Sequence, residues 1–201
     1  MADANTLSFP GLILNGACRH KRSGAHQGKD RYEHTIELKY DETSLATLEE
    51  RKEQERMTQV MFDMVEDLAY MVYQITEYQK AAQELILNHP KDKKPAEKLY
   101  DALERLRKDL VITTGDNYVG TAEPRLREKM GTLYSNIASS YDGVSATQMQ
   151  NFRLISGEFE LAQKRFEDIL KKEGSKFESV LKKNAMELPE LLQKNTYLGK
   201  D

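Results

Sequence analysis

The hydrophobic pattern is dominated by one long segment, Ser44 to Asn88, which contains neither glycine nor proline. Its apolar residues recur at steps of three and four, which places them in one stripe along an α-helix. The stripe consists of Met57, Val60, Met61, Met64, Val65, Leu68, Met71, Val72 and Ile75. A helix of this length extends roughly 65 Å at 1.5 Å per residue and needs packing partners to be stable. The pattern therefore predicts a long first helix within a helical bundle.

Short polar signals mark the two ends of this helix. Thr47 and Glu50 have the spacing of a capping box, and Ser44 is a rival N-cap. A His-Pro pair follows the segment directly and stops the helix. Residues 49–56 are almost wholly charged. This charge predicts that the opening third of the helix projects from the bundle or lies on its surface.

Three more amphipathic segments follow, each with a boundary residue suited to a helix end. Pro95 precedes the second, Pro124 falls in the first turn of the third, and Ser145 with Gln148 opens the fourth. Their apolar stripes are Leu99, Ala102, Leu103, Leu106 and Leu110; Leu126, Met130, Leu133, Tyr134 and Ile137; and Met149, Phe152, Ile155, Phe159, Ala162, Phe166 and Ile169. The connections, including residues 113–120, are short and polar. Short loops predict antiparallel neighbours, hence a mainly α fold with an up-down-up-down four-helix bundle.

The last part of the chain is less regular. Gly174 breaks or kinks the fourth helical pattern, and one more short amphipathic piece carries Phe177, Val180 and Leu181. A Leu-Pro pair at 188–189 ends the readable order. We therefore assign residues 43–186 to the bundle and residues 187–201 to a C-terminal tail.

One or two short β-strands are predicted ahead of the bundle. Residues Arg31 to Tyr40 alternate between two faces, which is typical of a half-buried strand. Residues 28–30 suit a hairpin turn, but the residues before them make a poor partner strand. We therefore interpret residues 29–42 as the last strand of a truncated β-sandwich, and residues 1–28 as a poorly ordered or atypical N-terminal segment.

Composition and charge exclude several classes of protein. The chain has 201 residues, of which 39% are hydrophobic and 31% charged, as expected for one bundle with a hydrated surface. Its net charge of −3 provides no field that would collect nucleic acid. No apolar run approaches the roughly 20 residues that span a bilayer. The first residues lack the pattern of a signal peptide. We therefore predict neither a nucleic-acid partner nor membrane insertion.

No residue pattern indicates catalysis or metal binding. A di-iron bundle needs Glu-x-x-His on two helices, and no histidine lies inside a predicted helix. The nearest approach to a zinc site is Cys18, His20 and His26, in a segment without any period. There is no G-x-S-x-G motif, and the sequence from Gly115 to Gly120 lacks the lysine of a P-loop. We predict no catalytic residue, no metal ligand, no cofactor and hence no enzyme.

The first helix is rich in methionine and tyrosine, which is compatible with ordinary core or with an adaptable groove for a partner. Tyr70 and Tyr73 fall off the main apolar stripe or at its edge. We therefore predict Tyr70, Tyr73 and Tyr78 as candidate contacts to another domain or protein.

The segment from Lys98 to Phe166 carries a family resemblance. Its features are the Leu-Tyr-Asp-Ala-Leu opening of the second helix, Glu123 and Leu126-Arg127 at the start of the third, Leu133-Tyr134 in its middle, and the Gly143-x-Ser145-x-Thr147-x-x-Gln150 loop. These resemble the helical C-terminal domain of large secreted glycosyl-hydrolase-like proteins built on BNR/Asp-box β-propellers of the sortilin-like kind. The sequence RYEHTIELKYD resembles the last strand of the β-sandwich before that domain, and EDLAYMVYQI falls where the long first helix lies. The resemblance covers about residues 29–185.

The resemblance implies a non-catalytic accessory bundle that packs against or positions a neighbouring β-propeller or β-sandwich domain of an exported, periplasmic or extracellular protein. Two features depart from the family. Asp41 is followed by Glu42 where the family often has Asp-Pro, and the chain has no tryptophan, so it contains no Asp-box. The glycosidase chemistry of the propeller is therefore not carried over, and a truncated or frame-shifted gene would explain residues 1–28.

The alternative function is a free-standing helical adaptor that dimerises or binds a partner helix. A fragment with glycosidase activity is not expected, because the two carboxylates of such an enzyme must be held in a cleft around the sugar.

Overall fold

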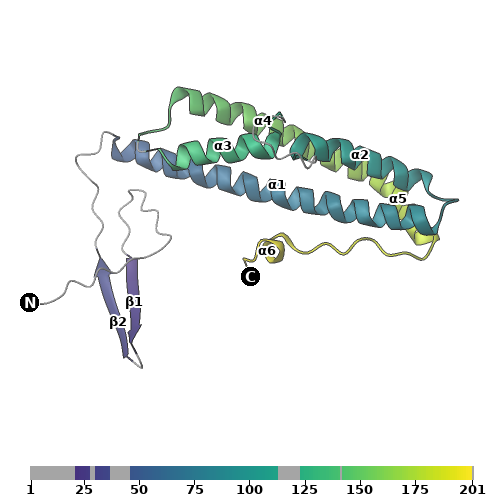
Figure 1. Ribbon diagram of the computed structural model, residues 1–201, viewed down its shortest axis with the longest axis horizontal. Helices are drawn as coiled ribbons and strands as arrows, with labels where there is room; N and C mark the ends of the chain where they lie inside the picture. Colours follow the sequence, from purple (N-terminus) through teal and green to yellow (C-terminus); the bar gives the residue numbers. More distant parts are fainter. Residues whose placement is uncertain (1–20, 28–29, 37–45, 113–122, 141, 201) are drawn as a thin grey trace, which may run out of the picture.

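The computed structural model describes residues 21–27, 30–36, 46–112, 123–140 and 142–200, and within them the chain is mainly helical (Figure 1). This confirms the predicted mainly α class. The elements in chain order are β1 (Lys21–Gln27), β2 (Asp30–Ile36), α1 (Leu48–Asn88), α2 (Lys94–Leu110), α3 (Leu126–Ala138), α4 (Ala146–Ile169), the π-helical turn η1 (Leu170–Gly174), α5 (Ser175–Lys183) and α6 (Lys194–Tyr197).

Strands β1 and β2 pair antiparallel in a two-stranded sheet, in a register that places Lys21 opposite Ile36 and Gln27 opposite Asp30. The predicted strand extended to residue 40, but residues 37–40 lie outside the described part of the chain. The residues before position 28 were expected to make a poor partner strand. They pair nevertheless, because ladder hydrogen bonds use backbone groups and do not require an alternating sequence. The described residues ahead of the bundle thus form a two-stranded hairpin.

Helix α1 begins where the capping box predicts. The Glu50 N–H donates to the Thr47 hydroxyl over 3.2 Å, and the Thr47 N–H donates to the Glu50 carboxylate over 2.7 Å. The Thr47 N–H and the Thr47 hydroxyl, which donates over 2.9 Å, both bind the Glu50 carboxylate and hold the pKa of Glu50 below its ordinary value. The rival N-cap, Ser44, lies outside the described residues. The predicted apolar stripe forms the core side of α1, with fully or nearly fully buried Met57, Met61, Leu68, Met71 and Ile75.

Helices α2 and α3 both run antiparallel to α1. Gln83 on α1 donates to Tyr100 on α2 over 3.3 Å, and Gln79, one turn earlier, donates to Glu104 over 2.9 Å. At the other end of α1, Gln54 contacts the last turn of α3. Figure 1 shows α2 along the C-terminal half of α1 and α3 along its N-terminal half.

The direction of α3 therefore differs from the predicted up-down-up-down order. Helix α3 continues in the direction of α2 instead of reversing it (Figure 1). The reason is length, because α1 has 41 residues whereas α2 has 17 and α3 has 13. Two short helices placed end to end cover a stripe that neither could cover alone.

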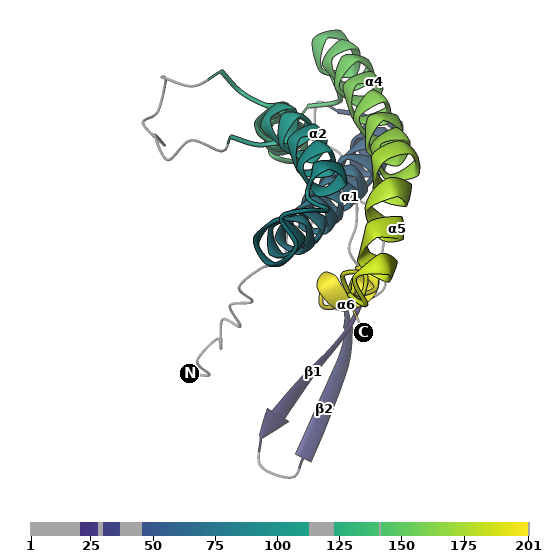
Figure 2. The same ribbon diagram turned by 90° about the vertical axis from the view of Figure 1, so that its right-hand side faces the viewer.

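Helix α4 reverses the chain and runs back along both short helices. Glu158 forms an ion pair of 2.8 Å with Lys129 on α3, and further along α4 Arg165 pairs with Asp109 on α2 at 2.9 Å. Figure 2, turned by 90°, shows α1, α2 and the continuous α4–α5 rod packed around one axis. Through most of its length the bundle thus has α1, one short helix, and the α4–α5 rod.

The charged opening of α1 lies on the surface of the bundle, one of the two arrangements predicted for residues 49–56, and Gln54 is its one buried residue. Gln54 is 1% exposed, and its side-chain amide donates to the carbonyls of Ile137 over 2.6 Å and Ser140 over 2.8 Å. The Arg51 guanidinium also donates to Ser140 O, over 3.2 Å. The last carbonyls of a helix have no partner within it. Polar side chains of α1 therefore serve here as the C-terminal cap of α3.

The predicted break at Gly174 is a π-helical turn. Residues 170–174 form η1, and the rod continues into α5 without leaving the bundle. The extra residue of a π turn changes the rotation of the helix and is found mostly as a single turn within an α-helix. Beyond it, Phe177 and Leu181 are fully buried and α5 packs against α2.

The C-terminal tail folds back along the bundle. The chain turns after Lys183, where Asn184 donates to Asp92 over 3.2 Å and Ala185 adopts a φ of 53°. From there the chain returns to α6, which lies beside the middle of α1 (Figure 1). The order predicted to end at residues 188–189 therefore continues to residue 200.

Candidate functional site

The predicted contact residues Tyr70 and Tyr73 lie together on α1, but they contact the chain's own tail. Their rings are stacked with centroids 6.0 Å apart. Tyr197 of α6 stacks on Tyr73 at 4.6 Å and lies tilted against Tyr70 at 5.8 Å. Aromatic pairs at such distances are favourable beyond the area they bury. The three tyrosines thus form one cluster that joins α1 to α6.

The hydroxyls of the same two tyrosines hold the tail backbone. The Tyr70 hydroxyl donates to the carbonyl of Leu192 over 2.8 Å, and the Leu192 N–H donates to the Tyr73 hydroxyl over 3.1 Å. Both backbone groups of one residue are therefore satisfied by side chains from α1. The Leu192 side chain takes no part in this contact and is 48% exposed.

Acidic and aromatic residues of α1 form ion pairs and a cation–π contact with the lysines of the tail. Lys194 forms a short ion pair with Asp67, which raises the pKa of Lys194. Lys200 pairs with Glu66 at 2.6 Å, and its ammonium lies 5.4 Å from the centroid of the Phe62 ring, a cation–π distance. We define the α1 face as the five residues of α1 that contact the tail, namely Phe62, Glu66, Asp67, Tyr70 and Tyr73.

Tyr78 lies apart from the α1 face. It is partly buried against the core, and burial together with the negative charge of Glu178 on α5 raises the pKa of its hydroxyl. The structure therefore brings two of the three predicted tyrosines together and places the third between α1 and α5. Sequence reasoning missed the tail contacts, although Lys194, Tyr197 and Lys200 recur at a spacing of three residues.

A second surface lies on the outer side of α4. Leu154 and Leu161 are 60% and 65% exposed, and their separation of seven residues places them on the same side of the helix. Leu154 also borders a hollow of about 360 Å³ between α3 and α4. The hollow is lined by Pro124, Lys129, Thr132, Leu133, Asn136, Asn151, Leu154, Ile155 and Glu158. An exposed leucine at a mixed polar and apolar hollow, with a second exposed leucine two turns further along the same side, suits contact with a protein surface.

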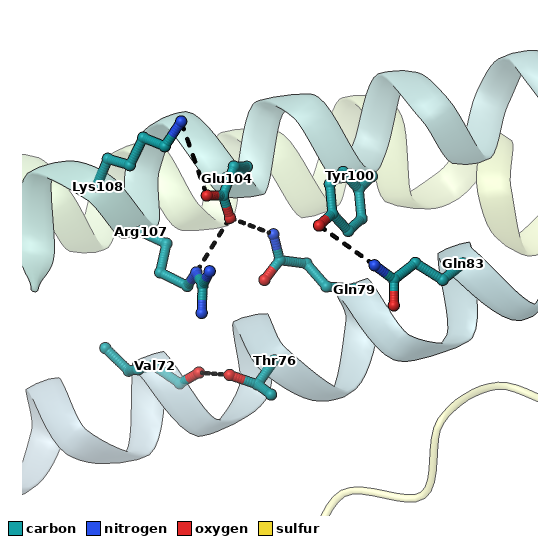
Figure 3. A network of polar contacts seen from close by, with 8 residues as sticks. All are labelled: Val72, Thr76, Gln79, Gln83, Tyr100, Glu104, Arg107 and Lys108. Carbon is teal, nitrogen blue, oxygen red and sulfur yellow. Dashed lines mark hydrogen bonds and ion pairs between the residues drawn. The ribbon is translucent and has the colours of Figure 1, made fainter. Parts of the chain in front are cut away.

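The polar network between α1 and α2 is shown in Figure 3. Gln79, which is buried, and Arg107 both donate to one oxygen of Glu104, over 2.9 and 3.0 Å, and Lys108 lies 3.8 Å from the other. Burial disfavours the charged form of this carboxylate, but the two hydrogen bonds and the two cations outweigh it. The pKa of Glu104 is therefore below its ordinary value. Because Gln79 lies on α1 and Glu104 lies on α2, this network links the two helices.

Other features of the described residues offer no organised chemistry. A hollow of about 470 Å³ beside η1 is lined by three basic and three acidic side chains, so it has no net charge: Lys98, Arg105, Lys172, Asp101, Asp168 and Glu173. Among the described residues no group of three or more His, Cys, Asp or Glu is placed to hold a metal ion. Cys18 and His20 lie outside those residues. No described helix is both long and apolar enough to cross a membrane.

Comparison with known proteins adds no relative. No protein-family model matches this chain, and no curated protein or solved structure matches it either.

Proposed function

We propose that this chain is a non-catalytic helical domain that packs against, or positions, a neighbouring domain or protein through the outer side of α4. The observation that carries the proposal is the exposure of Leu154 and Leu161 on one side of that helix. Scattered surface leucines are normal, but two on one side of a helix, one of them at the rim of a hollow, offer apolar side chains that a partner can cover. Burying both would contribute about 1.5–3 kcal/mol per side chain.

A β-propeller or β-sandwich as the neighbouring domain remains a prediction from the sequence resemblance. An exported, periplasmic or extracellular location is likewise a prediction from that resemblance. The chemistry of the α4 surface is compatible with such a neighbour, because Lys129 and Glu158 beside the leucines provide the polar rim that protein interfaces share.

The alternative is an adaptor that dimerises through the same surface. A two-fold contact places the same patch of each copy against itself. Leu154 of one copy would then meet Leu161 of the other across two antiparallel α4 helices. This arrangement would bury the leucines without any further protein.

Changing both leucines to glutamate, Leu154→Glu with Leu161→Glu, tests the surface directly. We expect the unchanged chain to be a monomer that binds an apolar fluorescent dye, and the double variant to lose roughly half of that dye fluorescence or more. Size-exclusion chromatography with light scattering gives the mass in the same samples. A dimer that the double variant converts to monomer would instead establish the adaptor.

The matched control is Leu87→Glu, which adds the same charge at a leucine that is 79% exposed near the end of α1. This variant is expected to retain both the mass and the dye fluorescence of the unchanged chain. A monomer whose dye binding is the same in all three proteins would contradict both forms of the proposal.

A further inference from the structure

We propose that the α1 face is a peptide-docking surface, that the C-terminal tail occupies it within the same chain, and that a partner segment with lysine, tyrosine and lysine at three-residue spacing displaces the tail. This surface lies on α1, whereas the proposed contact to a neighbouring domain lies on α4. The two proposals therefore stand or fall separately.

The first argument is that the α1 face binds the backbone of the tail. Tyr70 and Tyr73 hold the carbonyl and the N–H of Leu192, at 2.8 and 3.1 Å, and no side chain of the tail takes part. Residues 188–193 have no helical or strand pairing of their own. Extended peptides are commonly bound through main-chain hydrogen bonds, with side-chain contacts beyond them for specificity. Tyr70 and Tyr73 would therefore bind the backbone of another extended segment equally well.

The second argument is that three side chains fix which segment fits. Lys194, Tyr197 and Lys200 meet, in order, the Asp67 carboxylate, the tyrosine pair, and Glu66 with the Phe62 ring. Each acidic residue of the α1 face thus pairs with one lysine of the tail, and Tyr197, which lies between these lysines in sequence, contacts the tyrosine pair. The partner inferred from this complementarity is a protein segment with the pattern Lys-x-x-Tyr-x-x-Lys after an extended stretch.

The third argument is that the tail is attached weakly enough to exchange. Among the described residues, none after Met186 belongs to the buried core or packs against it. The tail is held by exposed or half-exposed hydrogen bonds, ion pairs, the Tyr197 ring contacts and one cation–π contact, each of which contributes about 1 kcal/mol. A tethered segment of this length competes at an effective concentration in the millimolar range. The tail thus excludes weakly binding peptides from the α1 face and is displaced by a peptide that binds more tightly.

The experiment uses a fluorescein-labelled peptide with the sequence of residues 187–201 as the probe, with binding measured by fluorescence polarisation. The receptor is the full chain with a weakened tail, Lys194→Ala with Tyr197→Ala, so that no charge at position 194 of the tail can pair with a reversed charge at Asp67. Because the tethered tail competes, we expect the peptide to bind this variant about tenfold more tightly than the unchanged chain. Circular dichroism of both proteins checks that the bundle is intact, since the changed residues lie outside its core.

A charge exchange distinguishes binding of the peptide to the α1 face from non-specific binding elsewhere on the protein. Adding Asp67→Lys to the weakened-tail receptor is expected to weaken peptide binding about tenfold, and a peptide with Lys194→Glu is expected to recover it. Undetectable binding to the weakened-tail receptor, or binding that Asp67→Lys leaves unchanged, would overturn the proposal. A dimer of the unchanged chain that Tyr197→Ala dissociates would also overturn it, because the occupant would then be the tail of a second copy.

Discussion

Replacing Phe177 by alanine is expected to lower the free energy of unfolding by about 3–5 kcal/mol, the usual effect of truncating a buried phenylalanine. Phe177 is fully buried and lies on α5, just beyond the π turn, where α5 packs against α2. Its ring is the largest side chain that α5 contributes to the core. Urea denaturation followed by far-ultraviolet circular dichroism measures the change.

A matched truncation on the surface of the same rod separates packing from helix propensity. Leu161→Ala removes an apolar side chain that is 65% exposed, and we expect it to change the free energy of unfolding by no more than about 0.5 kcal/mol. Equal effects of Phe177→Ala and Leu161→Ala would show that α5 does not pack in the core as described.

Replacing Gln54 by leucine is expected to cost about 1–3 kcal/mol, although leucine has a similar size and greater hydrophobicity. The amide of Gln54 donates to the carbonyls of Ile137 and Ser140 at the end of α3. Leucine removes both donors and leaves the Ile137 carbonyl with only backbone N–H donors of the helix end, such as that of Ser140 at 3.3 Å, and this loss at a buried site is more costly than the loss of an exposed hydrogen bond. The measurement is again denaturation in urea.

Gln59→Leu is the control for Gln54→Leu, because it makes the same change on the exposed side of α1. Gln59 donates only to the nearby Asp63 side chain at the surface, over 2.9 Å. Its replacement is expected to shift stability by about 0.5 kcal/mol or less. If Gln54→Leu were neutral or stabilising, the cap that α1 provides for α3 would have no energetic importance.

The helices and their buried sides were predictable from the sequence because both follow from local chemistry. Apolar residues at helical spacing define the stripe of α1, and the same reasoning gave the stripes of α2, α3 and α4. The caps were equally local. Thr47 with Glu50 and Ser145 with Gln148 form the capping boxes that their spacing predicts.

The order of helix directions was not predictable in the same way. A stripe shows which side of a helix is buried but not which helix covers it. Treating every loop as a reversal gave four alternating helices, whereas α1 is long enough to be covered by α2 and α3 in succession. The burial of Gln54 was not predictable for the same reason. Its partners are carbonyls more than 80 residues away, and no local pattern of charge reveals them.

The contact between the tail and α1 also depends on distant residues. Tyr70 and Tyr73 were predicted to contact another domain or protein because they lie off the apolar stripe or at its edge, whereas in the structure they contact the tail of the same chain. The lysines and Tyr197 carry a regular spacing, but a four-residue helix is too short for periodicity to reveal. Only the folded chain shows that this spacing matches the acidic and aromatic residues of α1.

The most direct test of the central claim, that the tail occupies the α1 face, is a spin-label distance between Gln59 and Asn195, with the single cysteine, Cys18, replaced by serine. Gln59 precedes Asp67 by about two helical turns, or about 12 Å. We therefore expect one short and narrow distance in the unchanged tail, and a broad distribution when Lys194→Glu and Tyr197→Ala are added. A broad or long distribution with the unchanged tail would contradict the account.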